Sequence, residues 1–410
     1  MKTDVAIVGG GASGLAAAVT VKELLPDADV TVLERLDRVG KKILATGNGR
    51  CNLSNADLAE GHYSGSLDCM RMIGGTPSAE EFFRSLGVIC TSDAQGRIYP
   101  YSNSAATVLN ALRLRISELG VNEVCGFELD SFERTGGGYR LCAADGRSVD
   151  CRRVIIAAGG YASQKHGTDG KVMRMLKSRG YKCTPVCPSV APLRVDADEI
   201  RGLAGVRAKG EVSAVADGKV LHIERGEIQF TADSLSGICV FDLARFFADF
   251  GDRLTVTADL APDMDKRTLT DYLFEMRRQR RECGLDELLS GLFNAKLAVY
   301  IVKRATGRKL GERVSTLKNG EIMRIADTIK AMSFRVTGCA PWNSAQVTYG
   351  GISAECVNDS LESATDRGLF LCGEILDVTG DCGGYNLQWA WSSGIWAARS
   401  CAGSLRGEGK

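Results

Sequence analysis

Apolar runs alternate with stretches of small residues near the start of the chain. Residues 5–8 form a short β-branched run without polar alternation, which predicts a strand that is buried on both faces. Residues 15–25 are small and apolar and predict a helix, and residues 30–33 predict a second strand. This strand–helix–strand order is typical of a parallel sheet covered by helices.

Further along the chain the pattern changes. Residues 120–132 predict a strand and 136–143 a hairpin, and residues 154–160 predict a buried parallel strand that ends in small residues. Three short alternating segments then predict antiparallel strands in a small barrel or sheet, at 210–215, 219–223 and 226–231. Helical periodicity follows at 268–283, 286–306 and 317–332.

The composition is that of an ordinary globular chain. Its 410 residues carry 51 Lys and Arg against 50 Asp and Glu, so the formal net charge is +1. This balance argues against a nucleic-acid binder held by bulk charge. The 15 cysteines are irregularly spaced and no leader pattern precedes the first strand, so we expect free thiols in the cytoplasm. We expect neither a membrane span nor a metal site, because no apolar run is long enough and no cysteine spacing suits zinc.

A G-x-G-x-x-G motif lies between the first predicted strand and the helix, at Gly9, Gly11 and Gly14. Gly9 permits a tight turn, Gly11 leaves room for a pyrophosphate beside the backbone, and Gly14 lets the helix pack closely on the strand. Unpaired N–H groups of the helix N-terminus then face the phosphates. Glu34 ends the second strand about 20 residues later, where a carboxylate accepts hydrogen bonds from ribose hydroxyls. These features predict a dinucleotide site that disfavours a 2′-phosphate.

The motif alone does not separate NAD from FAD, but the next segment favours the longer ligand. Residues 40–52 (GKKILATGNGRCN) form a glycine-rich, cationic loop directly after the acid-bearing strand. A ligand that extends beyond the pyrophosphate needs the backbone N–H groups and the cation that this loop offers. Taken alone, a solvated loop with a helix-capping Asn is the alternative.

The C-terminal region carries a second ligand-facing turn. Residues 368–372 predict a strand that ends in a Gly-Glu pair, and a Gly-Gly pair at 383–384 opens an apolar helix. Glu374 and Asp377 are candidates to bind ribityl hydroxyls or a water on the pyrophosphate. The positive end of the helix, near Asn386, would face the pyrimidine edge of a flavin, where negative charge accumulates on reduction. A capped core helix is the alternative interpretation.

Five segments carry a resemblance to a known family: GGGASG at 9–14, GKKILATGNGRCN at 40–52, IIAAGG at 155–160, TYGGIS at 348–353 and GEILDVTGDCGGYNLQWAWSSG at 373–394. Together they resemble the YhiN/BaiN-like family of FAD-dependent oxidoreductases, in the glutathione-reductase-like superfamily. The resemblance implies a bound FAD, a bacterial protein and an FAD domain interrupted by an inserted domain. Some members are described as aminoacetone-oxidase-like and others as reductases of bile-acid intermediates, so the substrate stays open.

The resemblance also implies a set of site residues. The glycine motif would lie on the pyrophosphate, Glu34 on the adenosine ribose, the loop to Asn52 along the ribityl and isoalloxazine, and the backbone of Leu129 against the adenine. The family usually has Thr or a small residue where this chain has Cys382, which we interpret as a simple substitution. The expected cofactor-binding residues are Gly9, Gly11, Ala12, Ser13, Gly14, Glu34, Arg35, Lys41, Lys42, Thr46, Gly47, Asn48, Gly49, Arg50, Cys51, Asn52, Leu129, Ala158, Gly159, Gly373, Glu374, Asp377, Gly384, Asn386, Leu387 and Gln388.

We therefore expect an α/β fold, a Rossmann-like FAD-binding domain with a parallel sheet, helices and a small antiparallel sheet. Its first part would be residues 1–189 and its second part 339–410. Residues 190–338 would form an inserted substrate-side domain, β-rich over 190–260 and helical over 261–338, with a β-barrel and helices.

Other features restrict the chemistry. The arginine run at 277–281 favours a solvated helix face over a nucleic-acid contact. His166 is a candidate for proton transfer, although a loop residue is the favoured interpretation. No second G-x-G-x-x-G follows a strand and no C-x-x-x-x-C pair exists, so neither a dedicated nicotinamide domain nor a redox-active disulfide is expected.

Three functions stay open for a flavoprotein of this kind. The first is hydride transfer through flavin N5 between NAD(P)H, as a transient co-substrate, and a small organic substrate such as an alicyclic or steroid-like compound. The second is the oxidation of a small amine or hydroxy compound. The third is action on RNA or on a protein partner. The sequence assigns no catalytic residue and no oligomeric state.

Overall fold

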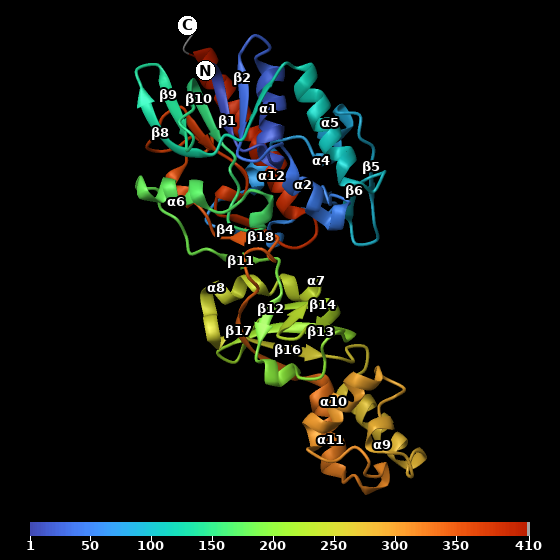
Figure 1. The fold of residues 1–410 in the computed structure, drawn as a ribbon. Coiled ribbons are helices and arrows are strands. Elements are labelled where there is room, and N and C mark those ends of the chain that lie inside the picture. Colours follow the sequence, from blue (N-terminus) through green and yellow to red (C-terminus); the bar gives the residue numbers. More distant parts are fainter. Residues whose placement is uncertain (408–410) are drawn as a thin grey trace. The chain divides into compact units, whose positions relative to one another are not determined.

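The computed structural model describes residues 1–407, and these form two compact units (Figure 1). The first unit combines Met1–Pro188 with the chain from Trp342 onward, and the second is Ser189–Pro341. The last stretch that we assigned to the FAD domain extends to residue 410, and its residues 408–410 lie outside the described range.

A seven-stranded sheet forms the centre of the first unit (Figure 1). Its parallel strands are β1 (Lys2–Val8), β2 (Val30–Glu34), β7 (Asn122–Cys125), β10 (Ser148–Ile156) and β19 (Leu369–Leu371). The hairpin of β8 (Leu129–Thr135) and β9 (Gly138–Ala143) adds antiparallel strands. The first half of β10 pairs with β9 and its second half with β19, so a strand from the far end of the chain completes the parallel sheet.

The burial of the strands agrees with their apolar patterns. Val5, Ala6 and Ile7 of β1 are completely buried, as expected of a strand covered on both faces. The prediction of one strand over residues 120–132 was wrong, because Gly126, with a φ of 69°, breaks the segment in two. Its first half became β7 of the parallel sheet and its second half became β8 of the hairpin.

Helices α1 (Ala12–Leu24) and α12 (Tyr385–Gly407) lie side by side (Figure 1). A Cβ at Gly394 of α12 would clash with the carbonyl oxygen of Ser13 in α1, so the two helices approach backbone to backbone. The contact brings the two ends of the described chain together. The other helices of this unit are α2 (Lys41–Ala45), α3 (Met70–Gly74), α4 (Ala79–Ser85), α5 (Ala105–Glu118) and α6 (Lys171–Ser178).

Three small sheets complete the first unit and hold its loops. They are β3 (Ser54–Asn55) with β6 (Arg97–Pro100) and β5 (Cys90–Ser92), β4 (Tyr63–Gly65) with β20 (Val378–Gly380), and β11 (Cys187–Ser189) with β18 (Val347–Tyr349). The β4–β20 pair joins an N-terminal loop to the turn that precedes α12.

The second unit is a closed six-stranded barrel with three long helices, which are inserted along the chain before the last barrel strand. The barrel strands are β12 (Leu193–Val195), β15 (Ser234–Ser236), β14 (Lys219–Phe230), β13 (Arg207–Ala216), β16 (Thr255–Asp259) and β17 (Met332–Cys339). Strand β14 runs without a break through two of the predicted segments. The helices are α9 (Lys266–Gln279), α10 (Ala295–Thr306) and α11 (Asn319–Lys330), with the short α7 (Ile238–Phe241) and α8 (Phe247–Phe250) beside the barrel.

The fold class predicted from the sequence is confirmed: a Rossmann-like parallel sheet with helices and an inserted barrel-plus-helices segment. The predicted start of α10 was wrong by nine positions, because Asn294 caps the helix there by accepting a hydrogen bond from Leu297 N. No helix within residues 1–407 has the length and apolar character needed to cross a bilayer.

Candidate functional site

The glycine motif forms a tight turn between β1 and α1. Gly9 has a φ of 105°, and a Cβ there would clash with the carbonyl oxygen of Ala157 at the end of β10. A Cβ at Gly14 would clash with the Gly9 carbonyl oxygen. A Cβ at Gly11 would meet no atom within 4 Å. Two glycines therefore allow packing inside the protein, whereas Gly11 borders open space at the N-terminus of α1, where unpaired N–H groups attract an anion.

Glu34, at the end of β2, is buried beside this turn and is 8% exposed. Its Oε2 accepts a hydrogen bond from Gly10 N at 2.9 Å, and its Oε1 accepts one from Leu36 N at 2.8 Å. Each carboxylate oxygen can accept a second hydrogen bond. Glu34 therefore holds the glycine turn in place and keeps acceptor capacity for a hydroxyl.

A polar network crosses the carboxyl end of the parallel sheet. Lys42 Nζ contacts Glu374 Oε2 at 2.6 Å, and Glu374 Oε1 accepts a hydrogen bond from Thr348 N at 2.9 Å. The side chains of this ion pair are 22% and 20% exposed, so both partners are mostly shielded from water. Thr348 Oγ1 accepts hydrogen bonds from Tyr161 N and Ala162 N, just beyond β10. The network joins loops after β2, β10 and β19, the edge where ligands of such sheets bind.

The loop from Thr46 to Asn52 has an unusual backbone. Gly47, Asn48, Gly49 and Cys51 all have φ between 56° and 83°, and two of these residues are not glycine. Asn52 follows, and its Oδ1 is buried and lacks a hydrogen-bond partner among the residues that the structure describes. Such an acceptor costs about 1–3 kcal/mol unless a donor reaches it. A ligand with an N–H donor beside Asn52 Oδ1 would therefore stabilise this loop.

The turn before α12 lies against the same loop. A Cβ at Gly384 would lie 2.8 Å from Asn52 Oδ1 and would clash with the Ser54 carbonyl oxygen. Gln388 is buried and uses both ends of its amide, because Ser54 Oγ donates to its Oε1 and its Nε2 donates to Ser392 Oγ. Asn386 likewise bonds the backbone of Gly380 with both ends of its amide. The side-chain amides of Gln388 and Asn386 therefore stabilise the turn through hydrogen bonds inside the protein.

Charged residues gather near the hairpin of β8 and β9. Arg35 Nη1 pairs with Asp169 at 2.8 Å, and Arg35 Nη2 lies 3.6 Å from Glu128.

The pKa of His166 is lowered, first by burial and then by the positive charges of Lys165, Lys42 and Lys41. His166 is therefore biased toward the neutral form, which can accept a proton but is a poor donor at neutral pH.

Every residue that we expected to bind the cofactor lies in the first unit. The structure brings together Lys42 with Glu374, and Asn52 with Gly384; a Cβ at Gly373 would clash with Ser13 Oγ. Other candidates have protein partners. Lys41 pairs with Asp37, Arg50 stacks on Tyr99, Asp377 accepts from Ser66 N, Thr46 donates to the Ile43 carbonyl, and the backbone of Leu129 is paired in β8.

The chain's own residues fit an FAD along this edge. Open space at Gly11 beside the α1 N-terminus suits a pyrophosphate, and Glu34 can accept from ribose hydroxyls. The orphaned Asn52 Oδ1 is an acceptor, and the pyrimidine ring of a flavin carries an N–H donor. Sequence reasoning missed one further pair beside the α12 turn, His62 with Asp381. These residues are 319 positions apart, and no local pattern links them.

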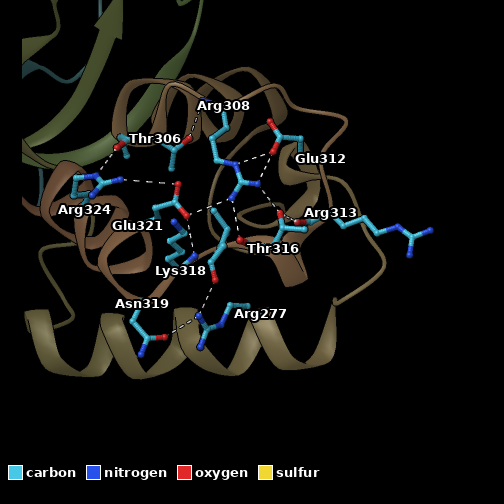
Figure 2. A network of polar contacts seen from close by, with 12 residues as sticks. Arg277, Thr306, Arg308, Glu312, Arg313, Thr316, Lys318, Asn319, Glu321 and Arg324 are labelled. Carbon is cyan, nitrogen blue, oxygen red and sulfur yellow. Dashed lines mark hydrogen bonds and ion pairs between the residues drawn. The ribbon is translucent and has the colours of Figure 1, made fainter.

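The arginine run of the second unit is partly engaged within that unit. Arg277 Nη1 donates to the Leu317 carbonyl and to Asn319 Oδ1, both at 2.9 Å (Figure 2). Arg280 Nη1 bonds the 287–290 turn. In the same unit, Figure 2 shows Arg308 between Glu312 and Glu321. Arg277 and Arg280 therefore hold loops onto α9 and are not a free cationic face.

A family model described as the HI0933-like protein Rossmann domain matches residues 3–400. The chain belongs to the HI0933-like family. The resemblance to the YhiN/BaiN-like family is thereby confirmed. Family membership identifies the chain as an enzyme, an FAD-dependent oxidoreductase.

Individual relatives of this HI0933-like chain differ in their names. It is 35% identical to a 3-dehydro-bile acid delta(4,6)-reductase of Clostridium scindens, over 97% of this chain and 98% of that one. It is 24% identical to a ribosomal RNA dihydrouridine synthase of Haemophilus influenzae, over 97% of both chains. A quinol-fumarate reductase structure superposes with a TM-score of 0.53 at 14% identity, covering 100% of this chain and 72% of that one, and shares the fold alone.

Proposed function

We propose that this flavoenzyme reduces a carbon–carbon double bond conjugated to a carbonyl group, in a small alicyclic or steroid-like molecule, with NAD(P)H as the electron source. The observation that carries the proposal is the relative of 35% identity, which spans nearly the whole of both chains. A 3-dehydro, delta-4 compound has its carbonyl in conjugation with the double bond. Conversion of uridine to dihydrouridine, named for the more distant relatives, also saturates a double bond conjugated to a carbonyl.

Bound FAD would supply the two-electron chemistry, by accepting a hydride from the nicotinamide and passing it to the substrate. The residues of the chain would bind and orient the FAD and the substrate, and they would exclude water from the site. The α1 N-terminus and Gly11 would hold the pyrophosphate, Glu34 the ribose, and Asn52 Oδ1 the ring N–H. Lys42, held by Glu374, would place a shielded cation at the carboxyl end of the sheet.

The test begins with the absorbance spectrum of the purified protein, which should show bound flavin. Anaerobic mixing with NADH or NADPH should bleach the flavin rapidly with at least one of them. A 3-oxo-4,6-diene bile acid should then restore the oxidised spectrum and gain hydrogen at the double bond. Failure of both nicotinamides to reduce the flavin, or of every conjugated enone to reoxidise it, would refute the proposal. Rapid oxygen consumption with amines or alcohols would favour the oxidase instead.

A second candidate is the reduction of uridine in RNA, which the two dihydrouridine synthases favour. Against it stand the net charge of +1 and the internal bonds of Arg277 and Arg280. An RNA substrate would require salt-dependent binding of ribosomal RNA transcripts and dihydrouridine formation by the reduced enzyme. The absence of both would remove this candidate.

A further inference from the structure

His62 and Asp381 form a carboxylate–imidazole pair at the base of the turn that opens α12. His62 Nδ1 lies 3.0 Å from Asp381 Oδ2, and Asp381 N donates to the His62 carbonyl oxygen at 3.0 Å. Asp381 is 7% exposed, whereas the His62 side chain is 33% exposed. The pair therefore has an inner member that is shielded from water and an outer member that solvent reaches.

Two further contacts hold the imidazole ring, and a third supports its stacking partner. It stacks on the Tyr385 ring with centroids 4.4 Å apart and planes 19° apart. Tyr63 packs edge-on against the same Tyr385 ring at 5.8 Å. His62 Nε2 faces Asp57 Oδ2 at 3.4 Å, a carboxylate that is 69% exposed. The titratable groups around His62 are thus Asp57, Tyr63, Asp381 and Tyr385, with Glu60 on the same short helix. Asp381 and Tyr385 therefore fix the orientation of the ring on its inner side. The outer side of the ring, which faces the exposed Asp57, stays accessible to solvent.

The pair belongs to the same turn as the candidate flavin site. Tyr385, on which His62 stacks, directly follows Gly384, and Gly384 lies against the unpartnered Asn52 Oδ1. Asn55 Nδ2 also donates to the Gly383 carbonyl at 3.1 Å. His62 is therefore joined by direct contacts to the segment where the sequence and structure both favour the flavin ring.

Reduction of a conjugated double bond needs two hydrogens of different kinds. A hydride adds to the β-carbon, and the electron pair of the double bond moves toward the carbonyl. A proton then adds to the α-carbon, so the product gains one hydride and one proton. A positioned acid accelerates such a protonation by about 100- to 10,000-fold. His166, biased toward its neutral form, is poorly suited to this role.

We propose that His62, oriented by Asp381, is the acid that protonates the α-carbon of the substrate; this inference rests on the proposed double-bond reduction. The imidazolium gives its Nε2 proton to the carbon and becomes neutral, while Nδ1–H stays bonded to the Asp381 carboxylate. Water then returns a proton to Nε2 from the exposed side. Asp381 is a positioning residue, since it fixes which nitrogen faces outward.

The test compares His62→Gln and Asp381→Asn with the wild-type holoenzyme. His62→Gln should bind FAD normally and be reduced by NAD(P)H at the wild-type rate, because the acid is not needed there. Reoxidation by a 3-oxo-4-ene bile acid, whose double bond joins the α- and β-carbons, should slow about 100-fold or more. Asp381→Asn should slow reoxidation about tenfold or more and keep the reduction step. His222→Gln is the matched control, because His222 also faces a carboxylate, Glu224 at 2.7 Å, on β14 of the second unit.

A second measurement does not depend on turnover. The chain has three histidines, so a ¹⁵N-histidine NMR spectrum is simple to assign. The proton on His62 Nδ1 should give a hydrogen-bonded signal in the wild type that is lost in both His62→Gln and Asp381→Asn. The Nε2 signal of His62 should move when the bile acid is added.

The outcomes separate the two proposals. If the wild type reduces no conjugated enone, the proposed function fails and this inference falls with it. If the wild type is active and His62→Gln reoxidises at the wild-type rate with the same pH profile, only the role of His62 is overturned. The role of His62 would also be overturned if the wild type is active but its His62 Nε2 signal does not change when substrate binds.

Discussion

Alanine at Gly11 should weaken FAD binding without unfolding the protein, whereas alanine at Gly14 should destabilise the fold. The two positions lie three residues apart in one turn, and the substitution adds the same single carbon. Gly11 is the N-cap of α1 and Gly14 lies inside the helix, and the main difference is what the added carbon would meet. At Gly11 it meets no atom within 4 Å, and at Gly14 it meets the Gly9 carbonyl oxygen. The pair therefore separates a ligand contact from a packing contact.

The expected magnitudes follow from these environments. Gly11 has φ −85° and ψ −164°, which alanine adopts without strain. The gain from a less flexible unfolded chain, about 0.4–1 kcal/mol, is offset by a similar loss at this helix N-cap. We expect a change below about 1 kcal/mol in the free energy of unfolding. A methyl group in the pyrophosphate position should cost about 1–3 kcal/mol of FAD binding, or roughly 5- to 150-fold in Kd.

For alanine at Gly14, the change in the free energy of unfolding combines a packing loss with a gain in helix propensity. A backbone carbonyl cannot rotate away as a side chain can, so the overlap should cost about 3 kcal/mol. The better helix propensity of alanine returns about 1 kcal/mol. The net loss of about 2 kcal/mol corresponds to a fall in Tm of about 4–8 °C.

Thermal unfolding of FAD-free protein and fluorescence titration with FAD measure the two quantities separately. Gly11→Ala should keep the wild-type Tm and lose affinity. The reasoning is refuted if Gly11→Ala binds FAD as tightly as the wild type, or if it is destabilised as much as Gly14→Ala.

Two further predictions concern Glu34 and His166. Glu34→Ala should weaken FAD binding and also lower the free energy of unfolding of the FAD-free protein by about 1–3 kcal/mol, because Gly10 N and Leu36 N lose their buried acceptor; denaturant unfolding with an unchanged midpoint would contradict this. Burial and nearby lysines lower the pKa of His166, so the unfolded chain binds its proton more readily and stability should fall as the pH drops below about 6.5. His166→Asn should be less acid-sensitive between pH 7.5 and the lower folded pKa, and parallel stability curves for the two proteins would argue against the assignment.

The elements that sequence patterns predicted well depend on local spacing. The glycine motif, the buried parallel strands and Glu34 are each defined within a few tens of residues. Prediction failed where a local pattern was compatible with two different strand pairings. Residues 120–132 had the apolar character of a single strand, yet β7 joined the parallel sheet because Gly126 turned the chain.

The candidate site shows the same division. Sequence alone determined that a dinucleotide fold is present, because strand, glycine turn, helix and acid are local features set by backbone sterics and burial. Only the tertiary structure decided that Lys42 meets Glu374 across 332 positions, that Gln388 and Asn386 use their amides internally, and that His62 meets Asp381. These contacts arise when α12 docks on α1 and β19 joins β10, and a pattern of neighbouring residues carries no record of such long-range packing.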